Sequence, residues 1–98
     1  MTQFKDLDPL LHSQLRLAVI SLLIGVESAE FKYLQEKTGA TAGNLSIQIT
    51  KLKEAGYIEV NKKFSNNYPQ TLCRITPLGK QKFAEYVKAL KEYLNPEK

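Results

Sequence analysis

The sequence contains few of the residues that enzymes and secreted proteins depend on. Its 98 residues include one cysteine, one histidine and no tryptophan. The single cysteine, Cys73, excludes an internal disulfide and is typical of a reducing compartment. Because His12 lies in a different predicted element, burial of the thiol is a simpler interpretation than a catalytic pair. No phosphate loop, metal-ligand spacing or nucleophile motif is present, so we expect no enzyme, metal or cofactor.

Long hydrophobic runs are also missing. The longest apolar stretch, 18–26, is interrupted by Ser21 and is shorter than the roughly 20 residues that span a membrane. Charged residues at positions 5, 6 and 8 occupy the place where the apolar part of a signal peptide begins. The composition, 43% hydrophobic and 24% charged, is globular, and residues 1–98 suffice for one domain. We predict a cytoplasmic protein without a membrane partner.

Basic residues are few in the first half of the chain and concentrated in the second. Residues 1–49 hold four Lys/Arg and five Asp/Glu, whereas residues 50–98 hold ten and five. This asymmetry favours a polyanionic partner for the C-terminal half. Lysines that merely face water on the last predicted helix are the alternative explanation.

The first predicted helix spans residues 7–25. Asp8 is a suitable N-cap, Pro9 suits the first helical position, and Gly25 follows the helix. The pattern places apolar residues on two opposite sides, and such a helix must be buried on both. Either its own chain wraps it or a second subunit covers it, and we favour the subunit. The side assigned to the dimer contains Leu10, Leu17, Ile20 and Ile24.

Residues 30–55 carry a helix-turn-helix pattern. A short helix is predicted to end at Gly39, and Thr41 can cap a second helix that Gly56 terminates. In that second helix Leu45, Ile49 and Leu52 share one face, which we expect to be buried. The opposite side suits base edges and phosphates, although polar helix faces often meet only water. The exposed Ile47 fits either a thymine methyl or a protein surface. The candidate DNA contacts are Thr41, Gly43, Asn44, Ser46, Ile47, Gln48, Thr50 and Lys51.

Residues 57–75 predict a β-hairpin. Alternating strands at 57–62 and 70–75 flank a turn-rich segment, in which Asn66 and Asn67 suit positive φ. Its cations and amides suit phosphates or a minor groove, whereas an ordinary solvated hairpin explains only the asparagines. Arg74 has an internal salt bridge as an alternative role. The candidate DNA contacts here are Lys62, Lys63, Asn66, Asn67, Tyr68 and Arg74.

The last predicted helix spans residues 76–94 and begins with Thr76 as N-cap and Pro77 at the first helical position. A helix of about 18 residues is about 27 Å long and extends beyond so small a core. We therefore expect its distal end to pack on a second subunit. The dimer residues predicted on this helix are Tyr86, Leu90, Tyr93 and Leu94.

The order of these elements and several short motifs resemble a known group of proteins. The run TGATxGNLS at 38–46, LKEAGYI at 52–58, ITPxG at 75–79 and LDP at 7–9 are similar to winged helix-turn-helix transcriptional regulators of the MarR-, ArsR- and PadR-like families. The resemblance covers most of residues 7–94. It implies a mainly α fold with a β-hairpin (α+β), in the order α-α-α-β-β-α with a long C-terminal helix.

The same resemblance implies a homodimer that binds double-stranded DNA in a sequence-specific way, most simply as a repressor. Two copies of the helix at 41–55 would enter successive major grooves, and the wings would lie on the flanking backbone or minor groove. Relatives often carry His or Arg at the positions of Ile47 and Gln48. Without such residues, Lys51 is the one cation on the side of this helix that lies opposite its buried face. The alternative is a protein-interaction module without specific DNA binding. A small effector in the dimer crevice and a redox role for Cys73 have no support in the sequence.

Overall fold

The computed structural model describes residues 4–96 of the chain. The elements follow the predicted order, with one short strand added near the N-terminal end of the helix-turn-helix. They are α1 (Gln14–Leu23), β1 (Ala29–Glu30), α2 (Phe31–Thr38), α3 (Ala42–Glu54), β2 (Ile58–Ser65), β3 (Tyr68–Ile75) and α4 (Pro77–Leu94).

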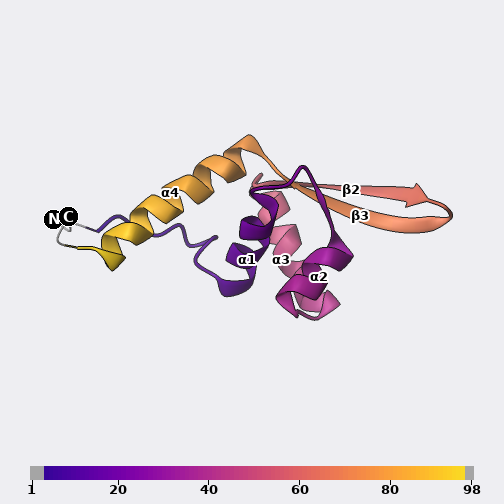
Figure 1. Cartoon of the computed structure of the whole chain (residues 1–98), viewed down its shortest axis with the longest axis horizontal. Helices are drawn as coiled ribbons and strands as arrows, with labels where there is room; N and C mark the ends of the chain where they lie inside the picture. Colours follow the sequence, from indigo (N-terminus) through magenta and orange to yellow (C-terminus); the bar gives the residue numbers. More distant parts are fainter. Residues whose placement is uncertain (1–3, 97–98) are drawn as a thin grey trace.

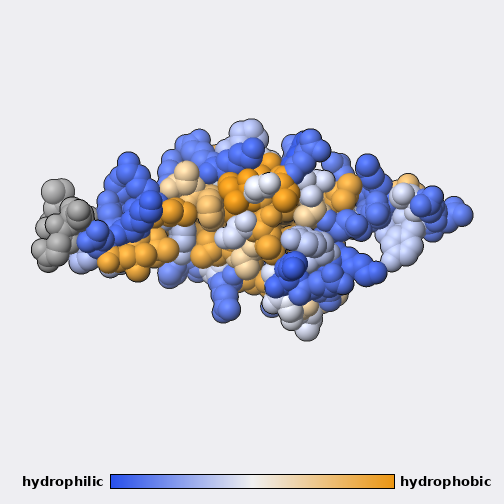
Figure 2. Space-filling view, viewed as in Figure 1, coloured by the Kyte–Doolittle hydropathy of each residue, from blue (hydrophilic) through white to orange (hydrophobic). Residues whose placement is uncertain are grey.

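Three helices form the centre of an elongated molecule that measures 56 × 25 × 21 Å. The β2–β3 hairpin and α4 project from this centre in opposite directions (Figure 1). Apolar side chains gather over the centre and along α4, whereas the surface of the hairpin is mostly hydrophilic (Figure 2). The side chains that are fully buried in the core are Leu11, Val19, Ile20, Leu23, Leu34, Leu45, Leu52, Ile58 and Cys73.

The three strands form an antiparallel sheet in the order β1-β3-β2. The hairpin is paired up to the Ser65–Tyr68 pair, next to a turn of two residues. Asn66 and Asn67 have φ values of 54° and 60°, which confirms the predicted left-handed turn. This two-residue turn with positive φ at both positions matches the twist of the strands and explains why they extend further than predicted.

Hydrogen bonds that two threonine hydroxyls accept from backbone N–H groups fix the starts of the helices that position the site. Thr41 Oγ1 accepts from the backbone N–H of Asn44 (3.1 Å) at α3, and Thr76 Oγ1 accepts from that of Gly79 (3.0 Å) at α4. A Cβ atom at Gly79 would lie 2.2 Å from the backbone oxygen of Tyr57, so only glycine allows α4 to begin this close to the hairpin. The start of α4 is therefore held against the base of the wing.

The first helix starts later than predicted. Asp8 caps only a short turn, in which its side chain accepts from Leu10 N (2.9 Å) and its carbonyl accepts from His12 N (2.8 Å). The chain becomes extended at Ser13, with φ −151° and ψ 125°, and α1 begins at the next residue. The Leu10 carbonyl, which a continuous helix would bond to a backbone N–H, accepts from Arg16 Nε at 2.6 Å instead.

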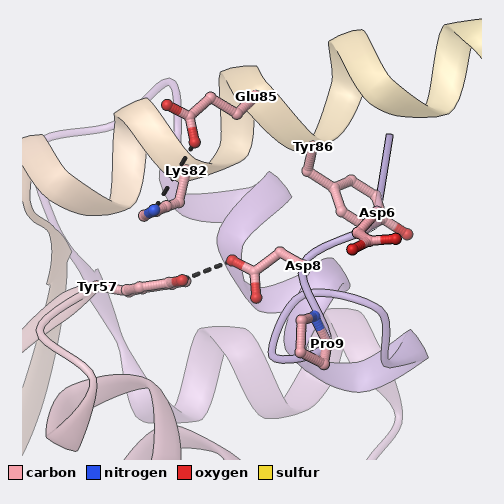
Figure 3. A pocket seen from close by; sticks show the side chains of 7 residues that line it. All are labelled: Asp6, Asp8, Pro9, Tyr57, Lys82, Glu85 and Tyr86. Atoms are coloured by element: carbon pink, nitrogen blue, oxygen red, sulfur yellow. Dashed lines mark hydrogen bonds and ion pairs between the residues drawn. The ribbon is translucent and has the colours of Figure 1, made fainter. Parts of the chain in front are cut away.

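The N-terminal segment lies along α4 and ties it to the core. The backbone N–H of Lys5 donates to Glu92 (3.2 Å), and Tyr93 OH donates to the Lys5 carbonyl (3.1 Å). Nearer the core, Tyr57 OH donates to Asp8 Oδ2 at 2.5 Å across a pocket of about 340 Å³ (Figure 3). Burial and the neighbouring Asp8 raise the pKa of Tyr57 above its ordinary value. The hydroxyl therefore stays protonated and joins the N-terminal segment to the end of the helix-turn-helix.

Two residues predicted for the dimer interface belong to the core. Ile20 is 0% exposed and Tyr86 is 5% exposed, and both belong to the hydrophobic cluster of the single chain. A second chain cannot remove from water a surface that is already buried. Among the other predicted positions, Leu10, Leu17 and Leu90 are half-buried, and Ile24, Tyr93 and Leu94 are exposed.

Candidate nucleic-acid interface

Helix α3 has the two faces that the sequence predicts. Leu45 and Leu52 are 0% exposed and Ile49 is 5% exposed, so this ridge fixes the rotation of the helix in the core. The opposite side is in contact with water, and Ile47 at its centre is 56% exposed. Of the candidate contacts on this helix and its cap, Gln48 is half-buried, and the exposed ones are Thr41, Gly43, Asn44, Ser46, Ile47, Thr50 and Lys51.

A hydrogen-bond chain crosses the edge of this exposed face. Arg16 of α1 donates from Nη1 to Gln48 Oε1, and Gln48 Nε2 donates to Asn44 Oδ1 at 3.0 Å. Asn44 and Gln48 also line a cleft of about 640 Å³ between α1 and the α2–α3 turn, together with Lys37. Two candidate base-contacting side chains thus have fixed partners within the protein.

The wing is cationic and exposes an aromatic ring. Lys62 and Lys63 are exposed on β2, and neither forms an ion pair with another residue within 4–96. The sequence contains no Asp or Glu between Glu59 and Glu85, so nothing acidic follows along the hairpin. Phe64, next to these lysines, is 79% exposed. This combination of free cations and an unburied ring is suited to a polyanion with apolar surfaces between its charges.

Arg74 does not lie at the tip of the hairpin. It stands opposite Glu59 near the base, where Nη2 lies 2.6 Å from Glu59 Oε1. The hydrogen bond and charge of Glu59 raise the pKa of this guanidinium. The alternative role that we predicted for Arg74, an internal salt bridge, is confirmed, and Lys62 and Lys63 are left as the cations of the outer wing.

Tyr68 is held by α2, which the sequence did not predict. Lys32 Nζ donates to Tyr68 OH at 3.4 Å and lies 5.9 Å from the centre of its ring. This contact joins the outer wing to the helix-turn-helix. No sequence signal marks it, because Lys32 and Tyr68 are brought together only by the fold.

Three residues near the candidate interface were missed by the sequence reasoning: Arg16, Lys32 and Phe64. A signal existed for Arg16, since it is the one Lys, Arg, Asp or Glu between Pro9 and Val26. A lone charge in an apolar helix indicates a specific partner, because burial without one is costly. For Phe64 the signal was an aromatic residue beside two lysines and a tight turn.

Within residues 4–96, no three His, Cys, Asp or Glu side chains lie together in a way that could hold a metal ion. Cys73 is fully buried in the sheet, and this burial raises the pKa of its thiol to about 11. None of the helices described here is long and apolar enough to cross a membrane.

Comparison with known proteins identifies the architecture. The sequence pattern of the family described as "Winged helix DNA-binding domain" matches residues 15–94. An uncharacterised protein of Methanocaldococcus jannaschii is 37% identical over 76 residues, which are 78% of this chain and 83% of that protein. The structure of a transcriptional regulator homologue from Pyrococcus horikoshii OT3 superimposes with a TM-score of 0.83 at 25% identity, covering 89% of this chain and 86% of that one.

A further solved structure is that of Bacillus subtilis PadR in complex with operator DNA. It superimposes with a TM-score of 0.69 at 17% identity over 82% of this chain and 48% of the PadR chain. At that identity the likeness concerns the fold alone, a helix-turn-helix followed by a β-hairpin and a last helix.

Proposed function

Since the chain belongs to the family of winged helix DNA-binding domains, we propose that it is a sequence-specific transcriptional regulator of the cytoplasm, acting as a homodimer. In its simplest form it represses by occupying a promoter. Helix α3 enters the major groove, and the β2–β3 wing lies on the flanking backbone or in the minor groove. The protein binds DNA and catalyses no reaction.

The observation that carries this proposal is the exposed side of α3. It combines short polar side chains with a half-exposed isoleucine, on a helix whose other side is fixed in the core by Leu45, Ile49 and Leu52. Hydroxyls and amides bond base edges and phosphates, and an aliphatic group contacts the thymine methyl in the major groove. The exposure of Ile47 has no structural use in the single chain, so a partner surface is its best explanation.

The wing supports the same proposal. Lys62 and Lys63 neutralise phosphates and release counterions, which makes affinity fall steeply with salt. Apolar side chains inserted between base steps are a recurrent device of proteins that bind the minor groove. We assign Phe64 this role, and Asn66, Asn67 and Tyr68 the contacts beside it.

The dimer is proposed from an apolar groove beside the start of α4. Ile24 of the α1 end, Phe83, Ala84 and Val87 line a volume of about 510 Å³, and three lysines also line it. Leu94, which is 76% exposed, continues this apolar surface towards the end of α4. A symmetric dimer predicts an inverted-repeat site with half-sites about 34 Å apart.

Analytical ultracentrifugation tests the dimer with a pair of matched variants. Ile24→Lys adds a charge inside the groove and should give monomers at concentrations where the unchanged protein is dimeric. Val26→Lys is the control, since Val26 is 45% exposed and does not line the groove. Equal dimerisation of both variants contradicts the proposed interface.

Fluorescence anisotropy with labelled duplexes tests the DNA-binding role. Asn44→Ala should lower the discrimination between the selected site and random duplex by about 5- to 100-fold, while the salt dependence is retained. If the unchanged protein binds both duplexes equally, α3 does not read bases.

The second candidate function is docking to another protein. The 56% exposure of Ile47 and the 79% exposure of Phe64 favour it, because both suit an apolar partner surface. Retention on random duplex or heparin across a salt gradient separates the two. A DNA-binding wing elutes late with a steep salt dependence, whereas a protein-docking module elutes early.

A further inference from the structure

We infer that Arg16, a residue outside the recognition helix, determines which base α3 reads. We call Arg16, Gln48 and Asn44 together the Arg16 relay. This inference rests on the proposed function and deepens it. Arg16 is a positioning residue: it acts through two amides and contacts no base itself.

The chemistry of arginine fixes the direction of every bond in the relay. A guanidinium has five N–H donors and no acceptor, so the group facing it must be the oxygen of Gln48. Nη1 of Arg16 donates to Gln48 Oε1, while Nε donates to the Leu10 carbonyl at 2.6 Å and holds the guanidinium in place. The amide of Gln48 therefore cannot rotate by 180° without placing an N–H₂ group against a cation.

The fixed amide of Gln48 then orients Asn44. Gln48 Nε2 points along the helix surface and donates to Asn44 Oδ1 at 3.0 Å. An oxygen is required there, because two N–H₂ groups do not bond each other. Asn44 is exposed, so the group that it presents outward is its N–H₂ donor. The relay converts an amide, which can read donors or acceptors, into a donor.

A donor of this kind selects among bases. In the major groove guanine presents two adjacent acceptors, N7 and O6, whereas adenine presents one acceptor beside an N–H₂ donor. Bidentate reading of adenine needs the asparagine oxygen at the base edge beside the N–H₂ group. Gln48 takes one of the two lone pairs of this oxygen and holds the oxygen towards the helix surface, which disfavours that geometry. The structure thus predicts guanine at the base pair that Asn44 contacts, preferred over adenine by about tenfold.

Two variants test the relay on the duplex that the unchanged protein selects. Gln48→Glu retains an acceptor for Arg16 but has no donor for Asn44. The Asn44 amide is then expected to turn, donate to the new carboxylate and present its oxygen. The preference at that one base pair should move from guanine to adenine or cytosine, which offer an N–H₂ donor. Arg16→Lys keeps the charge and the salt dependence but loses the planar fork, and the guanine preference should fall to about twofold or less.

A third measurement needs no substitution in the protein. Replacing the contacted guanine by 7-deazaguanine removes one acceptor and should weaken binding of the unchanged protein severalfold, with no effect on the Asn44→Ala variant. Circular dichroism of each variant establishes that α3 is folded.

The failure of this inference differs from the failure of the proposed function. The relay alone is overturned if the unchanged protein, Gln48→Glu and Arg16→Lys all bind DNA selectively and show the same preference at this base pair. Indifference of the unchanged protein to 7-deazaguanine also overturns it. Absence of salt-dependent binding to any duplex overturns the proposed function and the relay together.

Discussion

The wing lysines offer a prediction whose size follows from the structure. Lys62 and Lys63 lie outside any ion pair with residues 4–96, so each is available to one phosphate. Each phosphate contact contributes about 0.9 to the slope of log K against log salt. Lys62→Gln/Lys63→Gln should therefore flatten the slope by about 1.8 per chain, or about 3.6 per dimer. When salt is raised from about 50 to about 200 mM, the affinity of this variant for DNA should therefore fall about tenfold less, per chain, than that of the unchanged protein.

Fluorescence anisotropy across that salt range measures the slope, and two double variants control it. Lys5→Gln/Lys82→Gln removes the same charge from α4 and the N-terminal segment along it, which lie away from the wing and outside the proposed dimer groove. Glu59→Gln/Arg74→Gln removes the ion pair at the base of the hairpin without changing the net charge. Neither control should change the slope by more than a few tenths. An unchanged slope in the wing variant, or an equal change in the Lys5→Gln/Lys82→Gln variant, would refute the assignment of phosphate contacts to the wing.

Three further predictions concern single residues. Gly79→Ala should lower the unfolding free energy by about 1–3 kcal/mol in chemical denaturation, because the new methyl group meets the Tyr57 backbone, whereas Gly43→Ala, with open space around it, should be neutral or stabilising. Burial raises the pKa of Cys73 to about 11 from an ordinary value of 9.0. The stability that the buried thiol contributes is therefore complete below about pH 9 and is lost as the pH rises towards 11. The pH dependence of the unfolding free energy should weaken in Cys73→Ala, and the thiol of the folded protein should not react with a disulfide reagent at about pH 8. Phe64→Ser should change the unfolding free energy by less than about 0.5 kcal/mol but weaken DNA binding, and equal affinity would exclude the ring from the interface.

Local sequence signals predicted most of the fold because they act within one or two turns of chain. Thr41 and Thr76 bond the third backbone N–H that follows them, and Asn66 and Asn67 tolerate the conformation that a tight turn needs. The buried ridge of α3 followed from helical periodicity alone. Strand β1, with two residues, is too short to show any periodicity.

The errors arose where a side chain from elsewhere in the chain decides the outcome. Asp8 and Pro9 predict a helix start, but the guanidinium of Arg16, six residues after Leu10, takes the Leu10 carbonyl that would continue the helix. Glu59 neutralises Arg74 only because the strand register places them opposite each other. The same dependence on tertiary contacts hid the Arg16 relay, although the two amides on α3 were identified as candidate contacts.

Selection of duplexes from a random pool, sequenced after several rounds, tests the central claim that the exposed side of α3 reads DNA. We predict that the unchanged protein enriches one inverted repeat with half-sites about one helical turn apart. Selections run in parallel with Asn44→Ala and Ile47→Ser should lose the bases at the centre of each half-site. A pool that stays random, or a motif identical in all three proteins, would contradict it.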